Sequence, residues 1–155
     1  MEKIDSLNQV AEFHKTFNAP ILDTPQIPSP QRCELRVSLL QEELNELKQA
    51  IEDNDIVEIA DALCDLQYVL SGAVLEFGLG NIFVELFNEV QRSNMSKACE
   101  SEKQAQETVD FYKEKGQESF YEKSGEKFNV HRKEDHKVLK NKYYSPADLK
   151  TIIEN

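Results

Sequence analysis

The stretch that decides the fold is Gln41 to Asp65, "QEELNELKQAIEDNDIVEIADALCD", because it combines helical periodicity with a high density of acids. It holds nine carboxylates and one cation, Lys48, among leucine, isoleucine and alanine residues. Asn54 or Asp55 can cap a helix, so the stretch is expected to form two helices joined by a short turn. Carboxylates beside a core repel one another and lose solvation, and their positions therefore need a physical reason.

The apolar residues on either side of the turn predict two long helices. A stripe of large apolar residues follows the helix expected over 31–52 at steps of three and four: Leu40, Leu44, Leu47 and Ile51. The helix expected over 56–77 is apolar nearly all round and is followed by Gly78 and Gly80, which end it. A helix with apolar residues on all sides is expected to be central and buried.

The rest of the chain adds shorter elements around this pair. Four prolines between Pro20 and Pro30 predict an extended loop. The remaining expected elements are helices over 5–17, 81–93, 102–116 and 145–153, the last capped by Ser145, and a hairpin pairing 119–123 with 127–133. The sequence predicts an all-α antiparallel helical bundle with a small irregular or β-bearing C-terminal segment. We expect one domain over 1–155, with core helices about 5–115 and a basic segment about 116–155.

Composition restricts the classes of partner. The 155 residues carry a net charge of −11, and 30% of them are charged, which argues against nucleic acid or an anionic membrane as the main partner. Cys33, Cys64 and Cys99 form no CxxC pair and are each expected to be small buried hydrophobes. The N-terminal residues do not resemble a signal peptide, and no apolar run has the length of a membrane span. We therefore expect a cytoplasmic protein.

The acids occupy definite faces of the two long helices. Glu43 and Glu46 lie three residues apart, beside the leucine stripe, whereas Glu58, Asp61 and Asp65 follow one seam of the next helix. A tight turn between antiparallel helices would bring the two sets together. Either some of these acids are protonated or a cation lies among them, and Mg²⁺ prefers such oxygen ligands. Three further acids nearer the turn are expected to be solvated: Glu52, Asp53 and Asp55.

The same residues resemble a family signature. "EELNE" at 42–46 and "EIAD" at 58–61, eleven residues later, resemble the EExxE and ExxD motifs of the all-α nucleoside triphosphate pyrophosphohydrolases. This MazG-like superfamily includes phosphoribosyl-ATP pyrophosphohydrolase and the dimeric dUTP and dCTP pyrophosphatases. "EFHKTFNAP", "DALCDLQYVLSGAVLEFG", "FNEVQRSNMSKA" and "HKVLKNKYYSPADL" are similar to a branch related to dUTP-cleaving MazG-like enzymes.

The resemblance implies a metal-dependent hydrolase. It implies cleavage between the α- and β-phosphates of a nucleoside triphosphate, with Mg²⁺, or Mn²⁺ as a substitute, bound by four acids: Glu43, Glu46, Glu58 and Asp61. Glu42 and Glu43 are the expected catalytic residues. Glu42 is the candidate to orient the attacking water. Glu42 and Asp65 are also candidates to bind a second metal ion.

The resemblance also points to residues that contact the substrate. Asn94 and Lys97 in "SNMSK", with Arg92, match the family's nucleotide-contacting segment, and Lys137 and Lys140 are further candidates. The alternative for each of these cations is a solvated side chain. Four aromatic residues could face a base, although core packing is the commoner role at such spacing: Phe13, Phe17, Tyr68 and Phe83.

Three functions compete on this basis. The first is a house-cleaning hydrolase of (deoxy)nucleoside triphosphates, with dUTP as the leading substrate. The second is a phosphoribosyl-ATP pyrophosphohydrolase of histidine biosynthesis, and the third is a non-enzymatic acidic metal-binding helical module. The apolar helix of residues 56–77 has more apolar surface than one chain can cover, so we expect a homodimer or a dimer of dimers.

Overall fold

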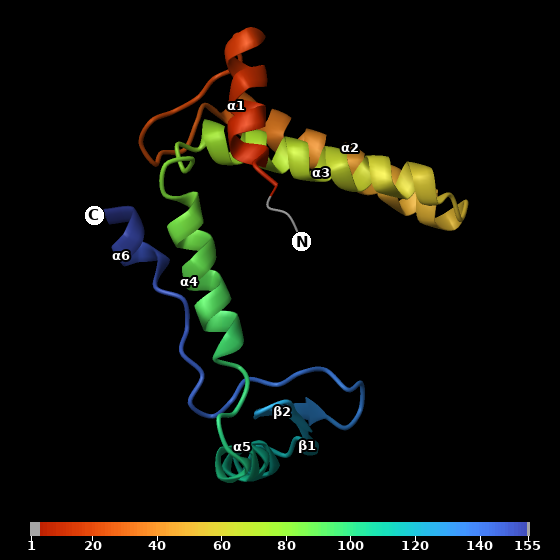
Figure 1. Ribbon diagram of the computed structural model, residues 1–155, viewed down its shortest axis with the longest axis vertical. Coiled ribbons are helices and arrows are strands. Elements are labelled where there is room, and N and C mark those ends of the chain that lie inside the picture. The colour runs from red at the N-terminus through yellow and green to blue at the C-terminus, as the bar shows by residue number, and fades with distance from the viewer. Residues whose placement is uncertain (1–3, 155) are drawn as a thin grey trace. The chain divides into compact units, whose positions relative to one another are not determined.

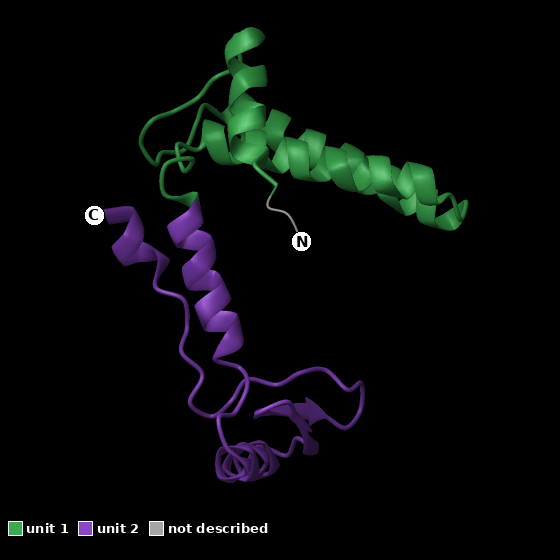
Figure 2. Ribbon diagram, in the orientation of Figure 1, with its two compact units in different colours: residues 1–83 green, residues 84–155 purple. Residues whose placement is uncertain are grey.

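The computed structural model describes residues 4–154. Contacts divide the chain into two compact units, residues 1–83 and residues 84–155 (Figure 2), and each is described by itself. This boundary differs from the division expected near residue 115 between the core helices and the basic segment. The prediction of one domain over 1–155 remains a prediction.

Unit 1 is a helical hairpin with a third helix packed on it (Figure 1). Its helices are α1 (Ser6–Thr16), α2 (Pro30–Glu52) and α3 (Ile56–Glu76), and α2 lies antiparallel to α3 along most of its length. Asn54 takes a positive φ of 54° in the turn, and the Asp55 carboxylate accepts hydrogen bonds from the N–H groups of Val57 at 2.9 Å and Glu58 at 3.2 Å. The predicted turn and cap are therefore present.

The proline-rich loop is extended and fixed to the end of α3. The Leu22 N–H donates to the Leu75 carbonyl at 3.0 Å, and the Gln26 N–H donates to the Phe77 carbonyl at 3.1 Å. Gly78 follows α3 with a φ of 69°, and a Cβ there would collide with the Thr24 carbonyl. Glycine is required at this position for both reasons, which explains why α3 ends where the sequence predicts.

The expectation that α3 is buried is wrong for much of its length within one chain. Burial is confined to Ala62 and residues 71–76, whereas Ile56 is 73% exposed and Val57 is 70% exposed. The physical reason is that, among the described helices of this unit, only α2 and α1 pack against it. Large apolar surfaces of the hairpin are consequently exposed in the single chain.

Unit 2 contains the rest of the secondary structure. It comprises α4 (Phe83–Met95), which begins at the unit boundary, α5 (Glu102–Glu114), the strands β1 (Ser119–Ser124) and β2 (Lys127–Arg132), and α6 (Leu149–Glu154). The strands form an antiparallel hairpin with Ser119 opposite Arg132 and Ser124 opposite Lys127. A small core packs α5 against this hairpin: Cys99, Ala105, Val130 and Leu139.

The final helix begins later than the sequence predicts. Asp148, not Ser145, receives the capping hydrogen bonds, from the Thr151 N–H at 3.2 Å and the Thr151 hydroxyl at 2.7 Å. Ser145 is engaged elsewhere, since its N–H donates to the Ser96 hydroxyl at 3.0 Å and its own hydroxyl accepts from Arg92. The chain therefore stays extended past Pro146, and the predicted Ser145 cap is wrong.

The predicted fold class is confirmed. Residues 4–154 form six helices and one two-stranded antiparallel hairpin near the C-terminus. Among the helices of these residues, none is long and apolar enough to cross a membrane. Cys99 is buried as predicted, but Cys33 of α2 is half-buried and Cys64 is exposed. Cys64 is exposed because it lies on α3, which is covered on too few sides.

Candidate functional site

The acidic cluster is built on the hairpin of unit 1. Glu42, Glu43 and Glu46 lie on α2, and Asp61 and Asp65 lie on the antiparallel α3. Helical spacing explains this arrangement, because residues three, four and seven apart share one side of a helix. Glu43 is the least exposed of these acids, and its Oε2 atom is buried without a hydrogen-bond partner among residues 4–154.

The charges around Glu43 reinforce one another. Partial withdrawal from water raises the pKa of Glu43 above its ordinary value, and repulsion from four neighbouring carboxylates raises it further: Glu46, Asp65, Glu42 and Asp61. Two of these neighbours belong to each helix. Glu43 is therefore within electrostatic reach of four of the other five acids predicted for the site.

The sixth acid, Glu58, lies nearer the turn. It occupies the first turn of α3, where its backbone N–H is bound by Asp55, and it does not contribute to the raised pKa of Glu43. Within residues 4–154, no three His, Cys, Asp or Glu side chains converge closely enough to form a ready-made metal cage. The predicted four-acid metal site of Glu43, Glu46, Glu58 and Asp61 thus stays a prediction.

The donor set nevertheless fits a hard divalent cation. Mg²⁺ binds carboxylate oxygens and retains several waters, so it does not need a complete cage of protein ligands. The unpartnered Oε2 of Glu43 and the four neighbouring carboxylates supply oxygen atoms of the required kind. A bound cation would also remove the repulsion that raises the pKa of Glu43.

A buried ionic cluster continues the hairpin interface toward α1. Glu76 of α3 is 1% exposed and forms ion pairs with Arg32 and Arg36 of α2. The pKa of Glu76 is subject to burial, which raises it, but the hydrogen bonds from the two guanidinium groups prevail and hold it below its ordinary value. His14 of α1 is bound to the Pro20 carbonyl at 2.8 Å and lies 3.5 Å from Arg36.

This ionic cluster was not anticipated from the sequence. The available signal was spacing, since Arg36 lies seven residues before Glu43 and shares its side of α2. Gly72 of α3 makes room for the cluster, because a Cβ there would lie 2.7 Å from the Arg36 guanidinium and 3.0 Å from the His14 ring. The cluster fixes the packing of all three helices behind the acids.

The predicted substrate contacts lie in unit 2. The Lys97 ammonium donates to the Asn94 side-chain oxygen at 2.7 Å, so these two residues are adjacent. The Lys140 ammonium lies 4.4 Å from the centre of the Tyr144 ring. The Lys137 N–H donates to Asp135 at 3.1 Å, while its side chain is exposed. Their binding of substrate phosphates remains a prediction.

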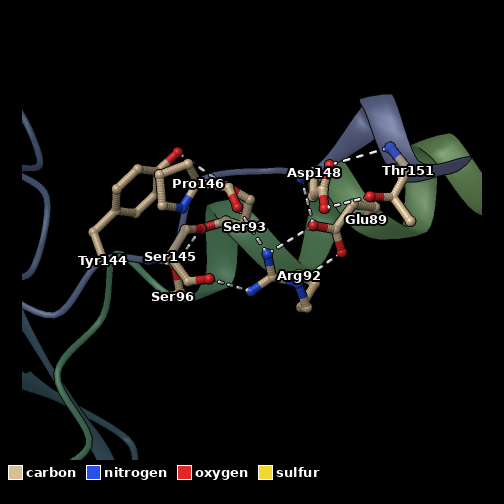
Figure 3. A network of polar contacts seen from close by, with 9 residues as sticks. All are labelled: Glu89, Arg92, Ser93, Ser96, Tyr144, Ser145, Pro146, Asp148 and Thr151. Atoms are coloured by element: carbon tan, nitrogen blue, oxygen red, sulfur yellow. Dashed lines mark hydrogen bonds and ion pairs between the residues drawn. The ribbon is translucent and has the colours of Figure 1, made fainter.

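Arg92 has a different environment from the other predicted phosphate ligands (Figure 3). Its guanidinium donates two 2.7 Å hydrogen bonds to Glu89, and further bonds to the Ser145 hydroxyl at 2.9 Å and the Pro146 carbonyl at 3.0 Å. The hydrogen bonds from Arg92, and then one from the Asp148 N–H, lower the pKa of Glu89 to about 2. Arg92 therefore fastens the C-terminal segment to α4, and its predicted contact with substrate remains a prediction.

Comparison with known protein families adds an independent observation to this geometry. The sequence profile of the family described as phosphoribosyl-ATP pyrophosphohydrolase matches residues 10–94, more than half of the chain. The chain belongs to this family. The part of this phosphoribosyl-ATP pyrophosphohydrolase family member that matches contains the acidic cluster, the ionic cluster and all of α4 except its last residue. Membership places the chain in the all-α nucleoside triphosphate pyrophosphohydrolase superfamily and implies pyrophosphohydrolase activity on a nucleotide.

A curated relative shares nearly the whole length of the chain. "Uncharacterized protein L479" of Acanthamoeba polyphaga mimivirus is 24% identical over an alignment of length 244, which covers 99% of this chain and 97% of the relative. Its name assigns no activity. The family match therefore carries the functional argument, and the relative shows that the similarity extends across both units.

Proposed function

We propose that this family member hydrolyses a (deoxy)nucleoside triphosphate to the monophosphate and pyrophosphate with the help of Mg²⁺. The proposed metal ligands are Glu43, Glu46, Glu58 and Asp61, and Mn²⁺ would replace Mg²⁺. Glu42 and Asp65 are the candidates to bind a second ion. The function is house-cleaning of the nucleotide pool, with dUTP as the leading substrate.

The observation that carries this proposal is the environment of Glu43. A buried carboxylate oxygen without a partner, next to four other carboxylates, is unfavourable in the free protein. A divalent cation and the triphosphate that accompanies it would turn this repulsion into attraction. A structural role alone does not account for acids in this position, because replacing them would relieve the repulsion.

The metal ion and the side chains would have different roles in the reaction. Bound Mg²⁺ would supply Lewis acidity and neutralise charge on the phosphates. Glu42 is exposed and adjoins the cluster, so its carboxylate is available to orient a water molecule and accept its proton. A water held in line with the α-phosphorus needs only a small displacement to react, and positioning of this kind contributes much of the rate in phosphoryl transfer.

Cations are needed for the phosphates that the acids do not hold. Asn94 and Lys97, already adjacent to one another, with Lys137 and Lys140, are the proposed phosphate contacts. Arg92 is included with a second role in fastening the C-terminal segment. Lys and Arg side chains neutralise the leaving pyrophosphate, which carries most of the negative charge released in the reaction.

We further propose that the active form is a homodimer or a dimer of dimers. Apolar side chains at intervals along both helices of the hairpin are exposed in one chain: Val37, Leu44, Ile51, Ile56, Val57 and Leu70. A second hairpin packed on these residues would form a helical bundle and bury them. A partner chain could then contribute its own cations to the acidic cluster.

A panel of triphosphates with pyrophosphate detection tests the function. The wild-type protein should release pyrophosphate from at least one (deoxy)nucleoside triphosphate in Mg²⁺, and EDTA should stop the reaction. Asp61→Asn should be inactive, whereas Glu52→Gln should keep wild-type rates because Glu52 is exposed and pairs only with Lys48. Absence of hydrolysis for every substrate would leave the non-enzymatic metal-binding module as the better reading.

A second candidate function is phosphoribosyl-ATP hydrolysis, which is favoured by the description of the matching family. The same assay separates it from the first when phosphoribosyl-ATP is included in the panel. The family match ends at residue 94, and the chain continues beyond it with a basic stretch that carries nine Lys or Arg against six acids over residues 113–142. This stretch lies outside the part of the chain that favours phosphoribosyl-ATP. We therefore rank nucleotide-pool hydrolysis first.

A further inference from the structure

A groove between α1 and α3 lies beside the acidic cluster and has no assigned role. Its volume is about 450 Å³ and most of its lining is apolar, including Val10, Leu63 and the ring of Tyr68. Ser6, Cys64 and Gln67 add polar atoms to the same wall. Pockets that bind small ligands combine an apolar lining with a few polar groups in this way.

Tyr68 joins the groove to the acids, because it follows Asp65 by three residues and Asp61 by seven and so shares their side of α3. Cys64 directly precedes Asp65 and follows Asp61 by three residues, and Tyr68 follows Asp65 by three. Because residues three and four apart are neighbours on a helix surface, Tyr68 and Cys64 lie between the acids and Gln67, an exposed residue further round the helix. If the phosphates of a ligand bind at the acids, the group attached to those phosphates would therefore reach the groove.

Gln67 offers a fixed hydrogen-bond acceptor. The Ser71 hydroxyl donates its proton to the Gln67 backbone carbonyl at 2.8 Å, so it can only accept from the Gln67 side-chain NH₂ group, at 3.0 Å. The same NH₂ group also donates to the Ser6 hydroxyl at 3.3 Å. These bonds determine which end of the amide is nitrogen. Among the described residues nothing donates to the remaining side-chain oxygen of Gln67.

Tyr68 provides an aromatic surface at the mouth of the groove. Phe13 of α1 holds the Tyr68 ring in an edge-to-face contact with 5.6 Å between ring centres, and Tyr68 remains 39% exposed. A planar ligand can stack on such a ring, and stacking is tolerant of the identity of the base. The groove thus presents an apolar slot, an aromatic wall and one acceptor.

We propose that this groove binds the nucleobase of the triphosphate, with the Gln67 side-chain oxygen accepting a hydrogen bond from an N–H on the edge of the base. This inference rests on the proposed function, since it places the base beside the acids that bind the phosphates. A nucleobase has apolar faces and at least one N–H donor on its edge, which matches the groove. A helix from a second copy would match it less well, because it would leave the Gln67 oxygen unpaired.

Cys64 makes the proposal testable without measuring turnover. Cys64 is exposed, whereas Cys99 is fully buried, so a Cys33→Ser variant leaves Cys64 as the accessible thiol. Its alkylation by iodoacetamide should be measured alone, with inorganic tripolyphosphate, and with α,β-imido deoxynucleoside triphosphates, each in Mg²⁺. At least one nucleotide should slow alkylation about tenfold or more. A ligand bound in such a pocket buries most of its own surface against the lining, which includes Cys64. Tripolyphosphate, which lacks a base, should have little effect.

Gln67→Leu provides the second arm. Because this variant loses one hydrogen bond to the base, the KM for the hydrolysed triphosphate should rise by up to about tenfold. The kcat should be nearly unchanged. Gln106→Leu is the matched control, an exposed helical glutamine of α5 whose side-chain NH₂ group donates to Asp110. Far-ultraviolet circular dichroism should be the same for both variants and the wild type.

Three outcomes would overturn the inference. Cys64 could be unreactive in the free protein, tripolyphosphate could protect it as well as a nucleotide, or no nucleotide could protect it although the wild type hydrolyses a triphosphate. Failure of the proposed function is distinguishable from these outcomes. In that case no triphosphate is hydrolysed, while protection of Cys64 by an imido nucleotide would still locate the base in the groove.

Discussion

Arg36 of α2 and Glu76 of α3 form an ion pair that is buried in unit 1, with the Glu76 side chain 1% exposed and the Arg36 side chain 9% exposed. Arg32 pairs with the same carboxylate from one turn earlier on α2. Desolvation of charges is costly, and the loss of one partner leaves the other charge buried without compensation. The pair therefore sets the packing of the hairpin on which the acidic cluster is built.

Glu76→Gln should be strongly destabilising for this reason. We expect the free energy of unfolding to fall by about 3 kcal/mol or more, the range for breaking a buried ion pair. Urea denaturation followed by circular dichroism measures it. Glu12→Gln, on an exposed position of α1, is the control, and equal stability of the two variants would contradict the role assigned to Glu76.

The same ion pair predicts a pH dependence in the wild type. The pKa of Glu76 is held below its ordinary value of 4.5, so the unfolded chain binds this proton more readily than the folded chain. The contribution of Glu76 is therefore complete above about pH 4.5 and is lost as the pH falls below it. Denaturation between pH 7 and pH 3 should show a steeper loss of stability for the wild type than for Glu76→Gln.

Asp61→Asn and Glu46→Gln should each abolish hydrolysis without unfolding the protein. Loss of even an outer-shell partner of a metal costs up to about 100-fold in activity, so loss of a direct ligand should cost at least as much. In EDTA both variants should be as stable as the wild type or more stable, because a neutral side chain lowers the repulsion on Glu43. Pyrophosphate release and thermal unfolding measure the two effects. Wild-type turnover in both variants would exclude these residues as ligands.

The free energy of unfolding depends on the ionisation of Glu43 in the opposite direction to its dependence on Glu76. Because its pKa is raised, the folded chain without metal binds the proton more readily than the unfolded chain. Stability is therefore lost as the pH rises above about 4.5 through the raised pKa of Glu43. Asp61→Asn should reduce this loss, and addition of Mg²⁺ should reverse it in the wild type but not in the variant.

Glu42→Gln should separate catalysis from metal binding. If Glu42 orients the attacking water, turnover should fall by about 100-fold or more, as for other groups that position or activate a nucleophile, while Mg²⁺ still binds. Titration calorimetry with Mg²⁺ gives the binding, and pyrophosphate release gives the turnover. Loss of Mg²⁺ binding together with activity would instead identify Glu42 as a ligand.

The exposed apolar face of the hairpin predicts assembly. Light scattering at micromolar concentration should report about twice the 17.8 kDa chain mass, or four times that mass for a dimer of dimers. Leu44→Glu should reduce this mass, because Leu44 is 50% exposed in one chain and a charge at a packed interface is unfavourable. Lys48→Glu, one turn further along α2 with an exposed side chain, is the control. An active monomer would contradict both the assembly and a site shared between chains.

The sequence by itself determined the secondary structure and the identity of the acids. Helical spacing located α1 to α5 within a few residues, the Asp55 cap and Gly78 located the ends of α3, and alternation located the β-hairpin. These features depend on neighbours along the chain, so local patterns are sufficient to predict them. The same spacing placed Glu43 and its neighbours on facing helices.

The tertiary structure alone decided which side chains are buried and what they contact. Glu76 lies 40 residues after Arg36, and no local pattern pairs them. Ser145 is drawn to Ser96 and Arg92, so α6 begins at Leu149. The unpartnered oxygen of Glu43 and the groove beside Gln67 likewise depend on how α1, α2 and α3 pack. The physical reason is that burial and desolvation are properties of surfaces that meet in space, whereas propensity and capping are properties of adjacent residues.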